Sequence, residues 1–344
     1  MKLNKILILL VIIAMTVSVT VLMAGNKDKI GGAGAQQLLI PVGSRAIAMG
    51  GASNAMVSGN EAIFWNPAGL SASSATAEAT FSNLQWLAET QVNYFAISSK
   101  VGRLGSIGIS AKIYDFGEFE QTTEFETEGT GIMVSPTNMV LGLTFSRQMT
   151  DRIFFGINAK LISESFMRMN ASGFALDIGV QYVSSSGIRM GLTLNNFGGM
   201  MQYSGEDLQR TVDLPYTEAG TESIDLRLEA QQFELPSTFE IGFAYDYRVN
   251  DQNVVTLATN YKNMNYGLDE VMGGVEYGFN DMFFVRGGYG QAPEGNADDN
   301  IFGFTAGAGI KYSLGGDSKI LVDYAFRDTK WFASNQWITV SVMF

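Results

Sequence analysis

The chain of 344 residues contains neither histidine nor cysteine, and this limits the chemistry that it can perform. Their absence removes the commonest general base, every thiol nucleophile and nearly all zinc sites. The Gly-rich fragment 105–108 carries a serine but reads as β wall, without the helix that follows a nucleophile elbow. Oxygen ligands for Ca²⁺ occur in the segment 296–300, but they lack EF-hand spacing, so we read an ordinary loop there. We therefore expect a protein that is not an enzyme and holds no metal or cofactor.

Many of the remaining charged residues lie in extended segments, where they alternate with apolar side chains. Those on the polar face of such segments are Lys112, Lys160, Asp177, Arg189, Glu240, Asp246, Arg248, Glu276, Lys311, Asp323 and Arg327. If this face surrounds a narrow lumen, the charges must pair, because an unpaired buried charge is costly. Pairing would make the wall rigid, whereas charges left facing water would line a conduction path. We favour pairing.

The end of the chain shows this alternation most clearly. Four apolar positions follow one another at intervals of two: Ile338, Val340, Val342 and Phe344. Soluble domains seldom end on such a strand because termini fray, whereas a transmembrane barrel must pair its last strand with its first. The four positions also resemble the signal that outer-membrane barrels present to the barrel-assembly machinery. Trp337 falls on the opposite phase, so we expect it to pack inside the barrel.

The same period of two recurs along the chain. It defines fourteen segments, which are residues 76–86, 90–101, 104–118, 136–148, 152–165, 171–184, 187–198, 236–249, 253–264, 269–279, 282–290, 301–313, 318–327 and 334–344. Repeated segments of this kind are typical of transmembrane β-strands, and a bacterial single-chain barrel requires an even count. Every second link is a short turn and the long links fall between these turns. With an even number of strands, this predicts that both termini of the chain lie in the periplasm. A soluble β-sandwich is the alternative, but it gives no reason to sort links by length.

One detail of the alternation concerns the segment 301–313. Its period of two places Phe302 and Phe304 together on the face that meets lipid. We therefore expect both rings on the outside of the barrel.

The overall composition agrees with a barrel. The mean hydropathy of +0.10 is near neutral, because half of each strand faces the interior. After residue 24 no apolar run approaches the ~20 residues that a membrane-spanning helix needs. Residues 1–24, with Lys2 and Lys5 before the apolar stretch Ile6–Met23, predict a cleaved signal peptide, and an uncleaved anchor is the alternative. Removing these two of the 22 basic residues leaves 20 against 34 acidic ones, and the net charge of −14 disfavours nucleic-acid binding.

Residues 25–75 are predicted to form a hatch, or plug, inside the barrel of residues 76–344. Small residues dominate 36–70, and an Asn-Pro step favours a tight turn in which Asn66 caps a helical turn starting at Pro67. The candidate hatch residues are Gly43, Arg45, Ala46, Met49, Gly50, Gly51, Trp65, Asn66, Pro67, Ala68, Gly69 and Leu70.

The sequence motifs at residues 43–52 and 65–70 of the predicted hatch resemble the N-terminal signature of PorV/PorQ-type proteins. These belong to the wider FadL-like group of fourteen-stranded outer-membrane barrels. Further similar phrases occur at 116–118, 151–160, 177–179 and 194–198, so the likeness covers nearly the whole mature chain. The resemblance implies an all-β, 14-stranded antiparallel transmembrane barrel with a luminal hatch. It also implies a place in the lipid of a Gram-negative outer membrane.

Two functions follow from this resemblance. PorV-like proteins are implied to be accessories of type IX protein secretion, with secretion-system subunits and the C-terminal domains of secreted cargo as partners. The alternative is a FadL-like channel for passive uptake of hydrophobic small molecules. The residues of the hatch and strand motifs favour the secretion role. The acidic loop 199–235 would serve as a docking surface for a basic partner, or simply as a solvated loop.

Overall fold

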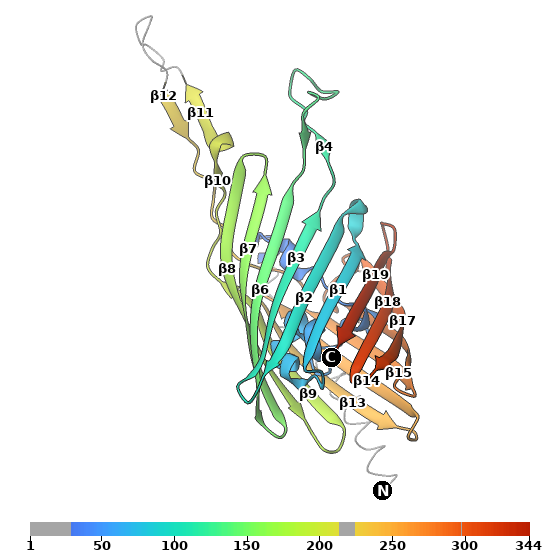
Figure 1. The fold of residues 1–344 in the computed structure, drawn as a ribbon. Helices are drawn as coiled ribbons and strands as arrows, with labels where there is room; N and C mark the ends of the chain where they lie inside the picture. Colours follow the sequence, from blue (N-terminus) through green and yellow to red (C-terminus); the bar gives the residue numbers. More distant parts are fainter. Residues whose placement is uncertain (1–28, 213–223, 297) are drawn as a thin grey trace, which may run out of the picture.

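The computed structural model describes residues 29–212, 224–296 and 298–344, so the predicted signal peptide lies outside the described residues. Within these ranges, fourteen antiparallel strands form one closed barrel (Figure 1), which confirms the predicted fold. They are β1 (Ala77–Gln85), β2 (Gln91–Val101), β3 (Gly105–Asp115), β6 (Thr137–Thr150), β7 (Ile153–Phe166), β8 (Met169–Val183), β9 (Ile188–Gly198), β13 (Thr238–Arg248), β14 (Asn253–Met264), β15 (Glu270–Phe279), β16 (Phe283–Gln291), β17 (Phe302–Gly315), β18 (Ser318–Thr329) and β19 (Asn335–Met343).

The two faces of the wall differ as the alternation predicts. On β2, Phe95 and Ile97 are 47% and 67% exposed on the outside, whereas Tyr94 and Ala96 are buried on the inside. An apolar outer face and a packed inner face are what a barrel in lipid requires. The ring closes where β1 pairs with β19, so the barrel wall has no free edge there.

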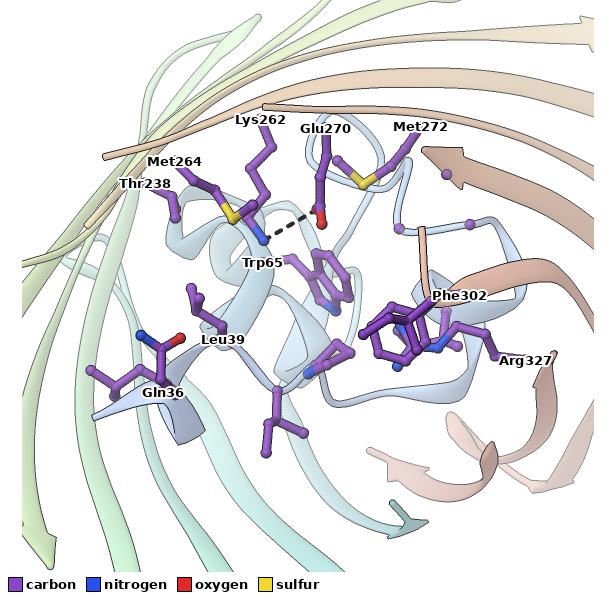
Figure 2. A pocket seen from close by; sticks show the side chains of 18 of the residues that line it. Gln36, Leu39, Trp65, Thr238, Lys262, Met264, Glu270, Met272, Phe302 and Arg327 are labelled. Carbon is purple, nitrogen blue, oxygen red and sulfur yellow. Dashed lines mark ion pairs between the residues drawn. The ribbon is translucent and has the colours of Figure 1, made fainter. Parts of the chain in front are cut away.

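The strand pairing is regular except at a few bulges, and one of them changes which way a ring points. Between β17 and β18 the register shifts between Phe302 and Thr305. A bulge adds a residue and so reverses the alternation beyond it. As a result Phe302 faces the lumen (Figure 2), whereas Phe304 is 55% exposed on the outside. The prediction that both rings face lipid is therefore wrong for Phe302.

Links of different length lie at opposite ends of the barrel. One end carries the short turns, at residues 102–104, 151–152, 184–187, 249–252, 280–282 and 316–317. The other end, here called the outer end, carries the long links. These contain two hairpins that project beyond the barrel in Figure 1, β4 (Phe119–Glu120) with β5 (Met133–Val134) and β11 (Gln209–Val212) with β12 (Ile224–Arg227). The short strand β10 (Ser204–Gly205) and the 3-10 helices η6 (Leu87–Glu89) and η7 (Glu206–Leu208) belong to this end as well.

The hatch occupies the lumen (Figure 1, blue). Its elements are the 3-10 helix η3 (Gln36–Leu39), the helix α2 (Ser44–Ala48), the 3-10 helix η4 (Gly59–Glu61), the helix α3 (Ala62–Trp65) and the 3-10 helix η5 (Pro67–Ala72). Asn66 caps η5 as predicted, because its Oδ1 accepts a hydrogen bond from Ala68 N at 3.2 Å. The hydrophobic core of the molecule lies between these elements and the inner face of the wall.

The described part of the hatch begins at the outer end of the barrel. There Ala33 forms a parallel bridge with Glu234, just before β13 starts. From that point the chain crosses the lumen and reaches β1 at the end with the short turns. The hatch therefore contacts both ends of the barrel.

Candidate functional site

Arg45 of the hatch forms hydrogen bonds with a cluster of charged side chains on the barrel wall. Its Nε and Nη2 donate hydrogen bonds to the two carboxylate oxygens of Glu276, at 2.9 and 2.8 Å. Arg286 of β16 donates to Glu276 and to Asp323 of β18, both at 2.5 Å. All three wall side chains are buried, so the pairing offsets the cost of removing their charges from water. The expected pairing of inward charges is confirmed at this cluster, although sequence reasoning missed Arg286.

Glu61 lies beside this cluster and holds the first turn of α2. Its Oε1 accepts a hydrogen bond from Ala46 N at 3.0 Å. A Cβ at Gly43 would lie only 2.2 Å from the same oxygen, and Gly43 has a φ of 86°, so glycine is required there. Burial raises the pKa of Glu61 to about 7, against the smaller lowering effects of the Ala46 hydrogen bond and the Arg45 charge. Glu61 therefore changes charge near neutral pH.

Glycines on the inner face of the wall leave room for the hatch backbone. A Cβ on Gly274 would lie 2.3 Å from the carbonyl oxygen of Met49, and one on Gly288 would lie 2.2 Å from its carbonyl carbon. Similarly, a Cβ on Gly156 would lie 2.2 Å from the carbonyl carbon of Pro67. These distances are far below van der Waals contact. The hatch backbone is thus seated in recesses that any side chain would fill.

Buried amide side chains tie the hatch to the wall. Nδ2 of Asn66 donates to Oδ1 of Asn54 at 2.7 Å and to the carbonyl of Val180 at 3.2 Å. Nδ2 of Asn60 donates to the carbonyl of Glu78 at 3.0 Å. Buried polar groups are costly unless they are paired, so these bonds fix the position of the hatch.

Residues 33–41, here called the strap, form the outer surface of the hatch. Gln36–Leu39 of the strap are the helix η3. Three wall side chains donate hydrogen bonds to strap carbonyls: Lys112 to Ile40 at 2.6 Å, Trp337 to Pro41 at 3.3 Å, and Tyr114 to Gln37. Trp337 is fully buried, which confirms that it packs inside the barrel.

A cavity of about 590 Å³, here called the vestibule, lies between the strap and the outer ends of the strands. Its surface is more apolar than polar. Figure 2 shows that its lining combines hatch and wall residues, with apolar side chains such as Leu39, Trp65 and Phe302 beside polar ones such as Gln36 and Arg327. One ion pair lies in the same lining, between Lys262 and Glu270 at 3.5 Å. A concave space that combines apolar surface with polar groups is typical of a small-molecule site, although the lining here is richer in polar residues than most.

Arg327 of β18 lies in an aromatic cage at the edge of the vestibule. Its guanidinium carbon is 3.7 Å from the ring centre of Phe302 and 5.0 Å from those of Trp86 and Trp337. Its Nη2 donates to Asn335 at 3.3 Å, while its Nε is buried without an acceptor among the described residues. The ring faces stabilise the cation in place of a carboxylate. The cage thus adds aromatic surface and a positive charge to the vestibule.

A second, small cavity of about 20 Å³ lies beneath the strap, and we call it the inner cavity. Leu38, Phe64 and Lys160 line both the vestibule and the inner cavity. Leu38 is 3% exposed, and Nζ of Lys112 lies 4.6 Å from the ring centre of Phe64. These three side chains therefore lie between the two cavities, and Lys160 is held there by its ion pair with Asp177 at 2.6 Å.

The structure brings most of the candidate hatch residues together. Gly50, Gly51 and Trp65 line the vestibule. Ala68 and Leu70 are buried in the core, and a Cβ on Gly69 would lie 2.2 Å from the carbonyl oxygen of Val57. The positions are compatible with a hatch, and the role of these residues as a functional motif stays a prediction.

The proposed assembly signal lies elsewhere, on the outer face of β19. Ile338 and Phe344 are each 54% exposed, and Val340 and Val342 are half-buried beside them. This surface would face lipid or another protein during assembly. Its recognition by the assembly machinery also stays a prediction.

The loop considered for Ca²⁺ and the acidic loop both lie at the outer end of the barrel. In the loop considered for Ca²⁺, an Asp299 oxygen accepts from Asn296 N at 2.7 Å, and Asp298 pairs with Lys330 at 2.5 Å. No group of three or more acidic residues with metal-binding geometry occurs in the described ranges. Three residues of the acidic loop, Asp213, Glu218 and Glu222, lie outside the described residues.

Comparisons with known proteins give a likeness of structure only. The chain matches no protein-family model and none of the curated proteins. It is similar to the CymD monoaromatic hydrocarbon channel, with 13% identity, a TM-score of 0.56 and coverage of 88% of this chain and 97% of that one. It is also similar to the toluene transporter TodX of Pseudomonas putida, with 15% identity, a TM-score of 0.55 and coverage of 88% of this chain and 97% of that one. A FadL homologue of Pseudomonas aeruginosa has 10% identity, a TM-score of 0.54 and coverage of 89% of this chain and 98% of that one.

The chain shares the fold of these three proteins. A likeness at this level of identity shows the fold alone, and two of these neighbours are themselves described as a channel and a transporter. In the described part of the chain, no helix is both long enough and apolar enough to cross a membrane. The narrower PorV/PorQ assignment finds no support in these comparisons.

Proposed function

We propose that this protein is a FadL-like channel that binds small hydrophobic molecules in the vestibule and passes them across the outer membrane. This was the alternative reading of the sequence, and the structure supports it better than the secretion reading does. The observation that carries it is the vestibule: a cavity of about 590 Å³, mainly apolar, that lies at the outer end directly above the hatch. The solved neighbours described as monoaromatic hydrocarbon and toluene channels add support through their shared fold.

The lining indicates the class of ligand. Rings of Trp65, Trp86 and Phe302 offer flat faces, and Met264 and Met272 offer adaptable apolar surface. Charged side chains of both signs, Arg327, Lys262, Glu240 and Glu270, lie in the same lining. This combination suits a molecule with a large aromatic or aliphatic part that also carries a polar group.

Type IX secretion, with the PorV/PorQ assignment, is the second candidate. The hairpins at the outer end favour it, because both carry exposed apolar side chains that a protein partner would cover. Phe125 beyond β4 is 93% exposed, and Leu226 of β12 is 49% exposed. In this role the barrel would receive cargo C-terminal domains on its outer loops.

A ligand titration with a matched pair of variants tests the first proposal. Phe302 and Phe304 are neighbours on β17, but only Phe302 lines the vestibule. Tryptophan fluorescence of the purified barrel is followed while a monoaromatic hydrocarbon is added, in a Trp331→Phe background that removes the tryptophan of an outer loop. We expect saturable binding that Phe302→Ala weakens by about tenfold and Phe304→Ala leaves unchanged.

The ligand titration of the purified barrel also distinguishes the channel from the secretion accessory. Equal affinities for the two phenylalanine variants, or no saturation, would argue against the vestibule as a binding site. Affinity purification from native membranes then becomes decisive. Co-purification of secreted proteins that share a C-terminal domain would favour the role in type IX secretion.

A further inference from the structure

Two neighbouring turns, at the end opposite to the projecting hairpins (Figure 1), carry exposed basic side chains. Arg103 lies in the turn between β2 and β3, and Arg152 lies in the turn between β6 and β7. Arg147, near the end of β6, is exposed as well. The turns are neighbours because β3 pairs with β6, and a Cβ on Gly105 of β3 would lie 3.2 Å from the Cβ of Arg147. The three arginines therefore form one patch, here called the basic rim.

The basic rim borders the face of the wall that meets lipid. Arg147 continues the outward phase of Phe145, whose ring is exposed on the outside of β6. Ile107 of β3 pairs with Phe145 and is exposed on the same face. Leu104, next to Arg103 in the turn, is exposed too. Cationic side chains beside an exposed apolar strip lie at the boundary between hydrocarbon and lipid headgroups.

The positive charge of the basic rim is not neutralised by its surroundings. In the described part of the chain, none of its three guanidinium groups pairs with a carboxylate. Lys100, near the end of β2, adds a fourth positive charge, because its Nζ donates to the carbonyl of Ser74 at 3.2 Å and not to a carboxylate. Asp151 is the one acidic residue in the two turns. An excess of positive charge thus remains at this place.

This excess is local. The other four short turns, at 184–187, 249–252, 280–282 and 316–317, contain no lysine or arginine, and three of them contain an aspartate. Lys311, which lies near one of these turns, is paired with Asp281 at 2.8 Å. At the outer end, the segment 118–128 holds five glutamates and no basic residue, which disfavours an anion there. Among the described residues, the basic rim is therefore the part of the membrane boundary that suits an anionic group.

We propose that the basic rim binds an anionic glycerophospholipid of the membrane leaflet at the end with the short turns. The phosphate accepts hydrogen bonds from the guanidinium groups, whose planar pairs of donors match phosphate oxygens. The acyl chains lie along Ile107 and Phe145 on the outer face of the wall. Basic clusters next to a membrane-spanning wall are a known basis for binding acidic headgroups. Because this surface lies outside the barrel, the proposal does not depend on what the lumen carries.

Native mass spectrometry of the purified barrel tests this site. Phosphatidylglycerol and phosphatidylcholine with the same acyl chains are titrated separately onto the wild type and onto variants in detergent. Arg147→Gln removes one charge, and a triple variant combines it with Arg103→Gln and Arg152→Gln. Arg248→Gln is the matched control, because Arg248 is also an exposed arginine at this end of the barrel, on β13, which β7, β8 and β9 separate from β6.

We expect the wild type to bind phosphatidylglycerol about tenfold more tightly than phosphatidylcholine. Arg147→Gln should weaken the binding of phosphatidylglycerol by about fivefold and the triple variant by about a hundredfold, while Arg248→Gln leaves it unchanged. Equal affinities for the two lipids, or equal losses in Arg147→Gln and Arg248→Gln, would overturn the site.

Two further additions identify the source of the phosphate. Excess inorganic phosphate should leave the phosphatidylglycerol adduct in place, because the acyl chains contribute to binding, and its displacement would contradict a lipid site. Tighter binding of lipid A than of phosphatidylglycerol would contradict it as well. Heat-modifiable gel mobility verifies that each variant is folded. The comparison of the two phospholipids uses the wild type, so it decides the proposal even if a variant does not fold.

Discussion

Arg45 of the hatch and Glu276 of β15 form an ion pair with two parallel hydrogen bonds, although 231 positions separate them in the chain. Glu276 also accepts from Arg286, so one wall carboxylate is shared between a hatch cation and a wall cation. The two-point geometry fixes the orientation of the guanidinium as well as its distance. The hatch is thus held at a defined angle to the wall, which keeps the vestibule above it in shape.

The first prediction concerns this pair. Arg45→Met keeps the length of the side chain but removes the cation, so Glu276 loses half of its partners in a buried place. We expect the barrel to lose about 3 kcal/mol of stability, measured by the urea dependence of heat-modifiable mobility. Arg168→Met serves as the control: Arg168 is 68% exposed in its side chain and pairs with Asp207 on the surface, so its loss should barely move the transition. Equal shifts in both variants would contradict a special role for Arg45.

The second prediction uses two adjacent glycines of β15. Gly274→Ala would place a methyl group against the Met49 backbone, whereas a Cβ at Gly273 meets nothing within 4 Å. We expect Gly274→Ala to cost about 1–3 kcal/mol and to raise single-channel conductance in planar bilayers, because the hatch must shift. Gly273→Ala should leave both quantities unchanged. If the two alanines behave alike, the wall glycines do not seat the hatch.

The strands could be predicted closely because each is decided locally. A period of two needs only neighbouring residues, and the predicted segment 253–264 coincides with β14. The exception is Phe302, where a bulge that depends on pairing with β18 reversed the alternation. Bulges are set by the partner strand, so the period of one segment gives no sign of them.

The site was harder to predict because its parts meet across the barrel. Arg45 and Trp65 were found through their motif, but their partners were not. Arg286 stands at an inward position of its strand, which was the available signal, yet nothing in one sequence says that it faces Glu276.

The third prediction is a dependence of hatch seating on pH. Burial raises the pKa of Glu61 to about 7, above its value in the unfolded chain. A raised pKa means that the neutral form is favoured in the folded state, so the stabilisation is fully present below the unfolded pKa and is lost as pH rises through about 7. The wild-type barrel should therefore be more resistant to urea at pH 5 than at pH 8. In Glu61→Gln this difference should shrink, and an undiminished difference would assign the effect to another group.

The last prediction separates two roles of the terminal residue. The backbone of Phe344 extends the seam between β1 and β19 beyond its eight residue pairs. Its N–H donates to the carbonyl of Ala77 at 2.9 Å and its C-terminal oxygen accepts from Thr76 N at 2.6 Å, while its ring is 54% exposed on the outside. Phe344→Ala keeps the backbone bonds, so the barrel refolded in detergent should be as stable as the wild type. Deleting Phe344 removes these bonds and should cost about 2 kcal/mol.

Assembly in cells gives the complementary reading. If the ring is part of the signal for the assembly machinery, Phe344→Ala should accumulate less folded barrel in the outer membrane than the wild type, despite equal stability in detergent. Phe344→Tyr retains an aromatic ring and should restore the yield. A normal yield of folded Phe344→Ala in cells would leave Phe344 with its structural role alone, since its contribution to the seam between β1 and β19 comes from its backbone and not from its side chain.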